Sequence, residues 1–143
     1  MLIDANLLLF AVDQESPFHD TARAWLSDVL NGNRRVGLPW QSLTAFLRIS
    51  THLGISKQPL SPDDAWQQIE DWLACAVTWI PLPTDRHATT LGDLVKRHRL
   101  HGRAITDAQL AALALEHGLT VYSADTDFAG FSEVEWKNPL TTR

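Results

Sequence analysis

The chain has 143 residues, 45% of them hydrophobic and 20% charged, which is enough apolar material for a buried core and excludes a disordered protein. The formal net charge of -5 excludes a general electrostatic attraction for nucleic acid or for anionic membranes. The lone Cys75 excludes an intramolecular disulfide, and the apolar run at residues 7–12 is too short to cross a bilayer. We therefore expect a cytoplasmic protein without a membrane segment.

The first half of the chain alternates between short apolar strands and amphipathic helices. Residues 1–3 are typical of a strand, and residues 18–30 repeat apolar side chains at helical spacing until Gly32. Residues 36–38 predict a second strand, which Pro39 ends. The apolar side of the next helix is marked by Leu43, Phe46, Leu47 and Ser50.

The second half continues this alternation. Ser61 is predicted to cap a helix that has Pro62 at its first position. The later elements are a strand at 76–80, a helix opened by Thr84 and Asp85, a helix from Asp107 to His117, a strand at 119–123 and a short last strand at 134–136. This alternation predicts an α/β protein with a parallel sheet covered on both faces, in which the first and fourth strands lie together at the centre.

Four aspartates stand at the ends of these apolar runs, namely Asp4, Asp107, Asp125 and Asp127. Because the carboxyl ends of parallel strands share one edge of a sheet, we expect their carboxylates to lie close together. Such carboxylates repel one another, and a cation relieves that repulsion. A cluster without His or Cys favours Mg²⁺ or Mn²⁺ over zinc. Each aspartate taken singly is equally compatible with a helix cap or a turn.

A basic stretch at residues 96–103 precedes Asp107 in an otherwise acidic chain. Two interpretations stay open. The stretch is either a solvated helix end, because Lys and Arg favour the last turn of a helix, or a rim that holds phosphates beside the metal site. The second interpretation makes Arg97, Arg99 and Arg103 candidate contacts to a nucleic acid.

Three motifs follow one another along the chain, LIDAN at residues 2–6, ITDAQLAA at 105–112 and SADTDF at 123–128. In this order and at these separations they resemble the PIN-domain ribonucleases, and specifically the VapC toxins of type II toxin–antitoxin systems. The resemblance covers essentially the whole chain. It implies one PIN-like domain over residues 1–143, folded as a three-layer α/β/α sandwich around a central parallel sheet.

The same resemblance implies an activity and partners. It points to a Mg²⁺- or Mn²⁺-dependent endoribonuclease that acts as a toxin on structured cellular RNA of the tRNA or rRNA class. It also implies a homodimer and a cognate VapB-type antitoxin. Residue by residue, Asp4, Asp107 and Asp125 match the metal-binding aspartates, and Asp127 matches an outer acid of the same catalytic set. Asn6 and Ser123 match the polar residues that support them.

One position departs from the family pattern. The family usually has a glutamate on the helix after the second strand, where this chain has Ala45. Gln41 lies one helical turn earlier, and Ser42 lies on the neighbouring row, so either is predicted to supply a neutral oxygen to that space. Arg48, on the same helix, is a further candidate for RNA contact.

The missing acid keeps a second interpretation open, a catalytically weak PIN-like module that binds RNA or a protein without cutting. A phosphatase of the haloacid dehalogenase type is disfavoured, because Asp4-Ala5-Asn6 lacks the second aspartate that such enzymes place two residues later. Four tryptophans lie on predicted apolar stripes, which favours packing in the core or in a dimer over base stacking: Trp25, Trp66, Trp72 and Trp79.

Overall fold

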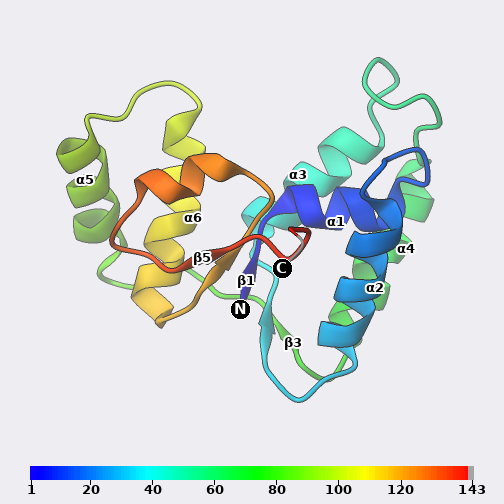
Figure 1. The fold of residues 1–143 in the computed structure, drawn as a ribbon, viewed down its shortest axis with the longest axis horizontal. Helices are drawn as coiled ribbons and strands as arrows, with labels where there is room; N and C mark the ends of the chain where they lie inside the picture. Colours follow the sequence, from blue (N-terminus) through cyan, green and yellow to red (C-terminus); the bar gives the residue numbers. More distant parts are fainter. Residues whose placement is uncertain (142–143) are drawn as a thin grey trace.

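A five-stranded parallel sheet forms the centre of the computed structural model, which describes residues 1–141 (Figure 1). The strands are β1 (Leu2–Ile3), β2 (Val36–Gly37), β3 (Thr78–Trp79), β4 (Val121–Tyr122) and β5 (Trp136–Lys137). Their order across the sheet is β3-β2-β1-β4-β5, and all pairings are parallel. Strand β1 thus lies between β2 and β4, which confirms the predicted central pair and places all carboxyl ends at one edge.

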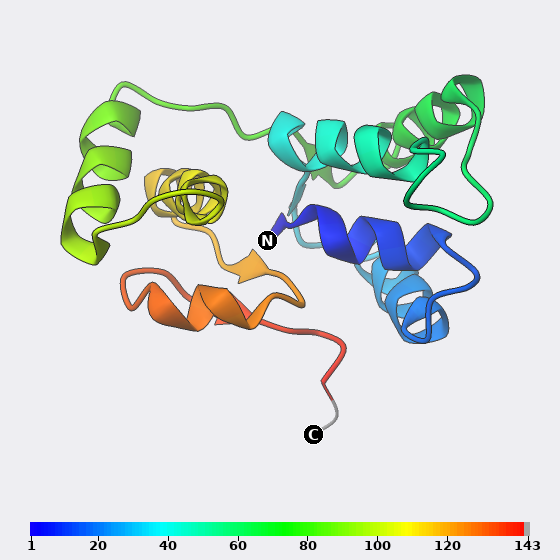
Figure 2. The ribbon, with the colours of Figure 1, turned by 90° about the horizontal axis from the view of Figure 1, so that it is seen from above.

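Helices cover both faces of this sheet and complete the three layers (Figure 2). They are α1 (Ala5–Val12), α2 (His19–Leu30), α3 (Trp40–Ser50), α4 (Pro62–Leu73), α5 (His87–His98) and α6 (Ala104–His117), with a short 3-10 helix η1 (Thr126–Gly130). Helices α1 to α4 gather on one side, and α5, α6 and η1 on the other (Figure 2). The predicted α/β/α sandwich with a central parallel sheet is confirmed.

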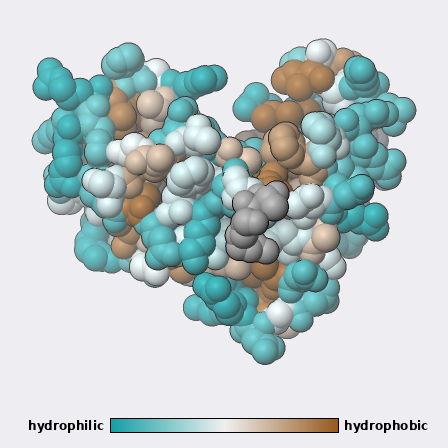
Figure 3. Space-filling view, viewed as in Figure 1, coloured by the Kyte–Doolittle hydropathy of each residue, from teal (hydrophilic) through white to brown (hydrophobic). Residues whose placement is uncertain are grey.

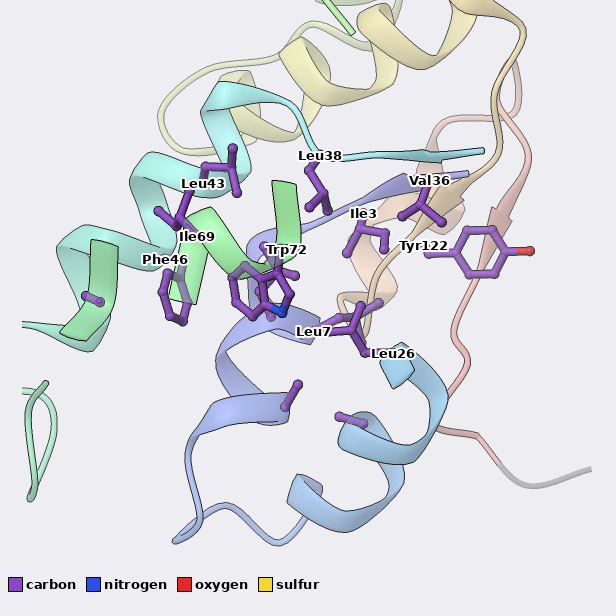
Figure 4. Close-up of a cluster of buried hydrophobic side chains, with 14 residues drawn as sticks. Ile3, Leu7, Leu26, Val36, Leu38, Leu43, Phe46, Ile69, Trp72 and Tyr122 are labelled. Atoms are coloured by element: carbon purple, nitrogen blue, oxygen red, sulfur yellow. The ribbon is translucent and has the colours of Figure 1, made fainter. Parts of the chain in front are cut away.

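The alternation of side chains along each strand gives the two faces separate cores. Ile3 and Tyr122 belong to the core beneath helices α1 to α4, which also contains Leu7, Phe46 and Trp72 (Figure 4). Their strand neighbours Leu2 and Val121 belong to the other core, with Leu94, Phe128 and the alanine-rich face of α6. Burial on both faces explains why these strands read as uninterrupted apolar runs.

Helix α1 is an element that the sequence analysis did not assign. It begins directly after Asp4, whose side chain caps it by accepting a hydrogen bond from the Ala5 N–H at 2.8 Å. Its sequence is apolar on almost every side, so it shows little helical periodicity and was interpreted only as an apolar run. Among residues 1–141, no helix combines the length and apolar character needed to cross a bilayer.

Some predicted boundaries and one predicted environment differ from the structure. The strands are shorter than their apolar runs, and the helix attributed to Asp107 begins three residues earlier, at Ala104. The last strand is shifted to β5, and α5 begins at His87. Trp66 is predicted to pack in the core or in a dimer. It is 43% exposed and therefore lies outside the core, because the buried face of α4 is formed by Ala65, Ile69 and Trp72.

Candidate active site

The carboxyl ends of β1 and β4 are tied together around the Asp4 carboxylate. The Asp4 N–H donates to the Tyr122 carbonyl at 2.9 Å, which extends the ladder between the two strands by one residue. The Ser123 hydroxyl donates to Asp4 Oδ2 at 2.7 Å, and the Asn6 amide donates to Ser123 Oγ at 3.1 Å. Asn6 Oδ1 in turn accepts from the Ala124 N–H at 3.1 Å. Asn6 and Ser123 therefore hold Asp4 in one orientation.

The other three predicted acids meet beside this network. Asp107, Asp125 and Asp127 each place one carboxylate oxygen within 4.8 Å of the others. Asp107 comes from the first turn of α6, while Asp125 caps η1 by accepting from the Asp127 N–H at 2.9 Å. Asp4 is not a member of this close group, although it lies near enough to interact electrostatically with Asp107 and Asp125. The grouping thus puts Asp127, and not Asp4, next to the Asp107–Asp125 pair.

The electrostatics of the cluster disfavour negative charge on its two most enclosed acids. Burial raises the pKa of Asp4, and the charge of Asp125 adds to this, whereas hydrogen bonds from Ser123 and Ala5 oppose it. The pKa of Asp107 rises to about 6, chiefly through burial and then through repulsion by Asp125, Asp4 and Asp127. Arg103 counteracts part of this rise. A site in this state gains stability from any bound cation.

The polar residues of α3 bond to neighbouring elements. Gln41 Nε2 donates to the Thr106 carbonyl at 2.8 Å and so ties α3 to α6 just before Asp107. Ser42 is buried and donates to the Ile3 carbonyl at 2.6 Å, so its hydroxyl stabilises the end of β1. Ala45 is half-buried on the same helix.

The predicted RNA-contact arginines come from α3, from the end of α5 and from the start of α6. Arg97 donates to Glu133 at 2.6 Å, and this pair joins the end of α5 to the segment before β5. Arg99 ends α5 in a left-handed conformation with φ of 51°. The charge of Arg103 lowers the pKa of Asp107, against the rise caused by burial and the other acids. Arg48 is exposed in the last turn of α3. Arg103 is thus the basic residue that the structure associates with the acid cluster.

A buried polar cluster that sequence reasoning missed lies on the far side of α6. The Glu116 side chain is fully buried and accepts hydrogen bonds from the Thr84 N–H and hydroxyl, both at 2.7 Å. The His87 Nδ1 lies 2.5 Å from its other oxygen. Burial opposes ionisation of Glu116, but the hydrogen bonds from His87 and Thr84 outweigh it and keep its pKa below the ordinary value. Because His87 and Glu116 are about 30 positions apart, no local residue spacing predicts their contact.

Ser123→Ala should weaken the site without removing a carboxylate. Loss of the hydroxyl deprives Asp4 of its 2.7 Å donor, so the pKa of Asp4 should rise further. Removing an outer partner of a metal ligand typically costs about 10- to 100-fold in metal affinity. Calorimetric titration of Mn²⁺ measures this change, and Ser123→Thr, which keeps the hydroxyl, is the matched control. Equal affinity in wild type and Ser123→Ala would contradict the supporting role of Ser123.

The parallel sheet, the helices on both faces and the acids at its carboxyl edge define a PIN-like α/β protein. A profile of the PIN domain family matches residues 1–134. The chain is 39% identical to Ribonuclease VapC37 of Mycobacterium tuberculosis over 138 residues, which cover 96% of each protein. It is 36% identical to Ribonuclease VapC33 of the same organism, again over 96% of both. The chain belongs to the PIN domain family, among the VapC ribonucleases.

Solved structures with low sequence identity share this fold. The structure of FitAB bound to a DNA fragment contains a chain that superposes with a TM-score of 0.70 at 22% identity, covering 99% of this chain and 96% of that one. Mycobacterium tuberculosis VapC20, described as a toxin that cleaves the sarcin–ricin loop, superposes with a TM-score of 0.68 at 15% identity, covering 96% and 98%. At these identities the likeness establishes the fold alone.

The donor set of the acid cluster fits a hard divalent cation. Asp107, Asp125 and Asp127 offer only carboxylate oxygens, which Mg²⁺ and Mn²⁺ prefer, and the site contains neither His nor Cys. Burial and then repulsion by Asp125, Asp4 and Asp127 raise the pKa of Asp107, so a cation beside Asp107 would favour its charged form. Figure 3 shows the surface hollowed between the lobe of α5, α6 and η1 and the lobe of α1 to α4, above the carboxyl edge of the sheet.

Proposed function

We propose that this protein is a divalent-metal-dependent endoribonuclease that acts as the toxin of a toxin–antitoxin pair. The observation that carries the proposal is the meeting of Asp107, Asp125 and Asp127 beside Asp4, at the carboxyl edge of a PIN-family sheet. Relatives at 34–39% identity that are named ribonucleases support the same activity. We assign Mg²⁺ or Mn²⁺ as the metal and structured RNA as the substrate, which places the action in the cytoplasm.

Each acidic residue has a separate task in this proposal. Asp107, Asp125 and Asp127 would hold the cation through carboxylate oxygens, and Asp4 would contribute a fourth carboxylate, which Ser123 and Asn6 keep oriented. A divalent cation held there would supply activation of a water and stabilisation of negative charge on the phosphodiester oxygens. The N-terminal turn of α6 adds partial positive charge beside Asp107, and Arg103 is available for a flanking phosphate. These local charges offset the net charge of -5 that would otherwise repel RNA.

The test is cleavage of RNA hairpins by the purified protein with Mg²⁺, with Mn²⁺ or with a chelator. We expect internal cuts that require the metal and that Asp4→Asn abolishes. Because Asp4 also caps α1, circular dichroism must confirm that the variant is folded. Asp93→Asn, which removes an exposed acid on α5, is the matched control and should cut as wild type does. Cutting that persists with chelator, or in folded Asp4→Asn, would refute the proposal.

Ala45 supports the second candidate function, a PIN-like module that binds RNA with weak or no cleavage. Under the nuclease proposal, Ala45→Glu should tighten Mn²⁺ binding, roughly tenfold, because it restores an acid to a position that is half-buried on α3. Calorimetry and melting temperature, measured together, check this. Unchanged affinity with a clearly lower melting temperature would mean that Ala45 packs and that the site consists of aspartates alone. Ala45→Gln, which adds a similar volume without charge, is the control.

Two protein partners belong to the proposal. One structure that shares this fold is a toxin–antitoxin complex from Klebsiella pneumoniae, and we propose that this chain also has an antitoxin, whose Lys or Arg enters the acid cluster in place of metal. Co-expression with the product of the adjacent gene should yield a complex and relieve growth arrest.

We further propose a symmetric homodimer. Light scattering that finds only the 16.0 kDa species at micromolar concentration would contradict the dimer.

A further inference from the structure

A small pocket is linked to the acid cluster through one of its lining residues, Gln41. It has a volume of about 190 Å³ and lies between the start of α3, the segment of residues 81–83, the start of α5 and α6. Gln41 belongs to its lining, and the same side chain is bonded to the Thr106 carbonyl at 2.8 Å, one residue before Asp107. The pocket is smaller than the roughly 300–1,000 Å³ of sites for drug-sized ligands. It therefore has room for one flat ring system beside the acids.

One exposed tryptophan lines this pocket, and a second tryptophan stacks on it from outside the lining. Trp40, the first residue of α3, lines it and is 41% exposed. The Trp66 ring stacks on Trp40 with centroids 6.5 Å apart and planes only 5° from parallel, so Trp66 fixes the plane of Trp40. Leu82, also part of the lining, is 58% exposed. Large aromatic rings left in water at a concave site are characteristic of surfaces that stack against a ligand.

The rest of the lining includes three polar side chains, those of Gln41, His87 and Gln109. His87 lines the pocket, and its Nδ1 faces the buried Glu116 carboxylate at 2.5 Å. Because a carboxylate only accepts hydrogen bonds, it assigns the proton to Nδ1 and leaves Nε2 as the nitrogen for a ligand. The amides of Gln41 and Gln109 also belong to the lining. These groups can donate to and accept from the edge of a nucleobase, whereas a purely apolar groove cannot.

We propose that this pocket holds one unpaired nucleobase of the RNA, next to the phosphodiester that is cut at the acid cluster. Trp40 stacks on the face of the base, and Gln41, His87 and Gln109 read its edge. The proposal rests on the ribonuclease function and adds a nucleotide preference to it. The pocket is small, concave and provided with three hydrogen-bonding side chains, which favours a base over the flat and largely apolar contact of a second copy of the chain.

The first test compares cleavage of a pool of RNA hairpins with randomised loops. Trp40→Ala should raise KM roughly tenfold and flatten the nucleotide preference at one position fixed relative to the cut. Trp40→Phe should retain most of that preference, because a smaller ring still stacks. Phe18→Ala, which removes an aromatic of similar exposure from the corner between α1 and α2, is the control and should behave as wild type. Wild-type KM and preference in Trp40→Ala would overturn the proposal.

The second test separates the pocket from the nuclease function and from dimerisation. An RNA hairpin with 5-bromouracil in its loop is irradiated with the Asp107→Asn variant, and crosslinked peptides are identified by mass spectrometry. We expect a crosslink at Trp40, whether or not the wild type cuts RNA. Crosslinks only elsewhere would overturn the proposal. Light scattering on Trp40→Ala tests whether a second copy of the chain occupies the pocket instead. If the wild type is a dimer and this variant a monomer, the face is an interface between copies and the proposal fails.

Discussion

Asp107→Asn should abolish metal-dependent RNA cleavage while stabilising the metal-free protein. Replacing even an outer partner of a metal ligand typically lowers metal affinity or activity by about 10- to 100-fold. Loss of a carboxylate inside the 4.8 Å group should therefore lower kcat by roughly 100-fold or more. The same change removes a charge that burial and three neighbouring aspartates disfavour. Asparagine has a similar shape, so the fold should persist. Single-turnover cleavage and Mn²⁺ calorimetry measure the loss.

The stabilisation in Asp107→Asn has a definite pH dependence. The folded protein binds the Asp107 proton more tightly than the unfolded chain does, because the pKa rises from 3.8 to about 6 on folding. The free energy of unfolding should therefore fall as the pH rises from 3.8 to 6 and stay low above that range. Since Asp107 is only partly enclosed, solvent screening reduces the effect to about 1 kcal/mol, or roughly 3 °C in melting temperature at neutral pH.

Melting curves with chelator between pH 4 and pH 8 check this expectation. Asp107→Asn should melt above wild type at neutral pH and approach it in acid. The control is again Asp93→Asn, which also removes one negative charge but from an exposed position on α5. Equal stabilisation by both variants would mean that the effect reflects the overall net charge and not the acid cluster.

Glu116→Ala should be the most destabilising single substitution outside the apolar cores. It leaves the buried Thr84 N–H and hydroxyl without their acceptor and deprives His87 of its partner. Unsatisfied buried donors and a broken buried pair together cost about 3 kcal/mol, or roughly 10 °C in melting temperature. Urea unfolding at neutral pH measures this difference.

The pH dependence of wild type supplies an independent check on Glu116. Its pKa in the folded protein is below the ordinary 4.5, so its contribution to stability is complete above pH 4.5 and is lost as the pH falls through the lowered value. The deficit of Glu116→Ala should accordingly shrink in acid. Glu70→Ala, an exposed glutamate on α4, is the control and should change stability by less than about 0.5 kcal/mol. A deficit that is independent of pH would show that lost packing, and not the carboxylate, is responsible.

The sequence predicts well those features that depend on residues close together in the chain, such as the strands and the aspartates that follow them. Asp4 and Asp125 follow apolar runs that become β1 and β4, so their meeting at one edge follows from parallel pairing alone. Helix α1 escaped prediction because it is apolar on nearly all sides and has almost no periodicity. The sequence leaves packing of Trp66 in the core or in a dimer open, because Trp66 adjoins Ala65 on the helix and only the packing of α4 decides which of the two faces the core.

Residue spacing does not predict contacts between side chains that are distant in the sequence. Helical spacing places Gln41 and Ala45 on one face of α3, but it does not predict the hydrogen bond from Gln41 to Thr106, 65 residues away on α6. The partnership of Glu116 with His87 depends on how α5 lies against α6. The same limit applies to the membership of the acid cluster, since side-chain geometry at η1, and not strand order, brings Asp127 beside Asp107.

The pairing of β1 with β4 also determines when, during synthesis of the chain, the site can assemble. Asp4 is synthesised early, but its partner Ser123 follows 119 residues later, and β4 must pair with β1 before the two ends of the site meet. A chain growing on the ribosome at about 5–20 residues per second holds Asp4 for several seconds without the other acids. An unfinished chain therefore has no assembled site, so the RNA of the ribosome that synthesises it is not exposed to a working nuclease until η1 has been made.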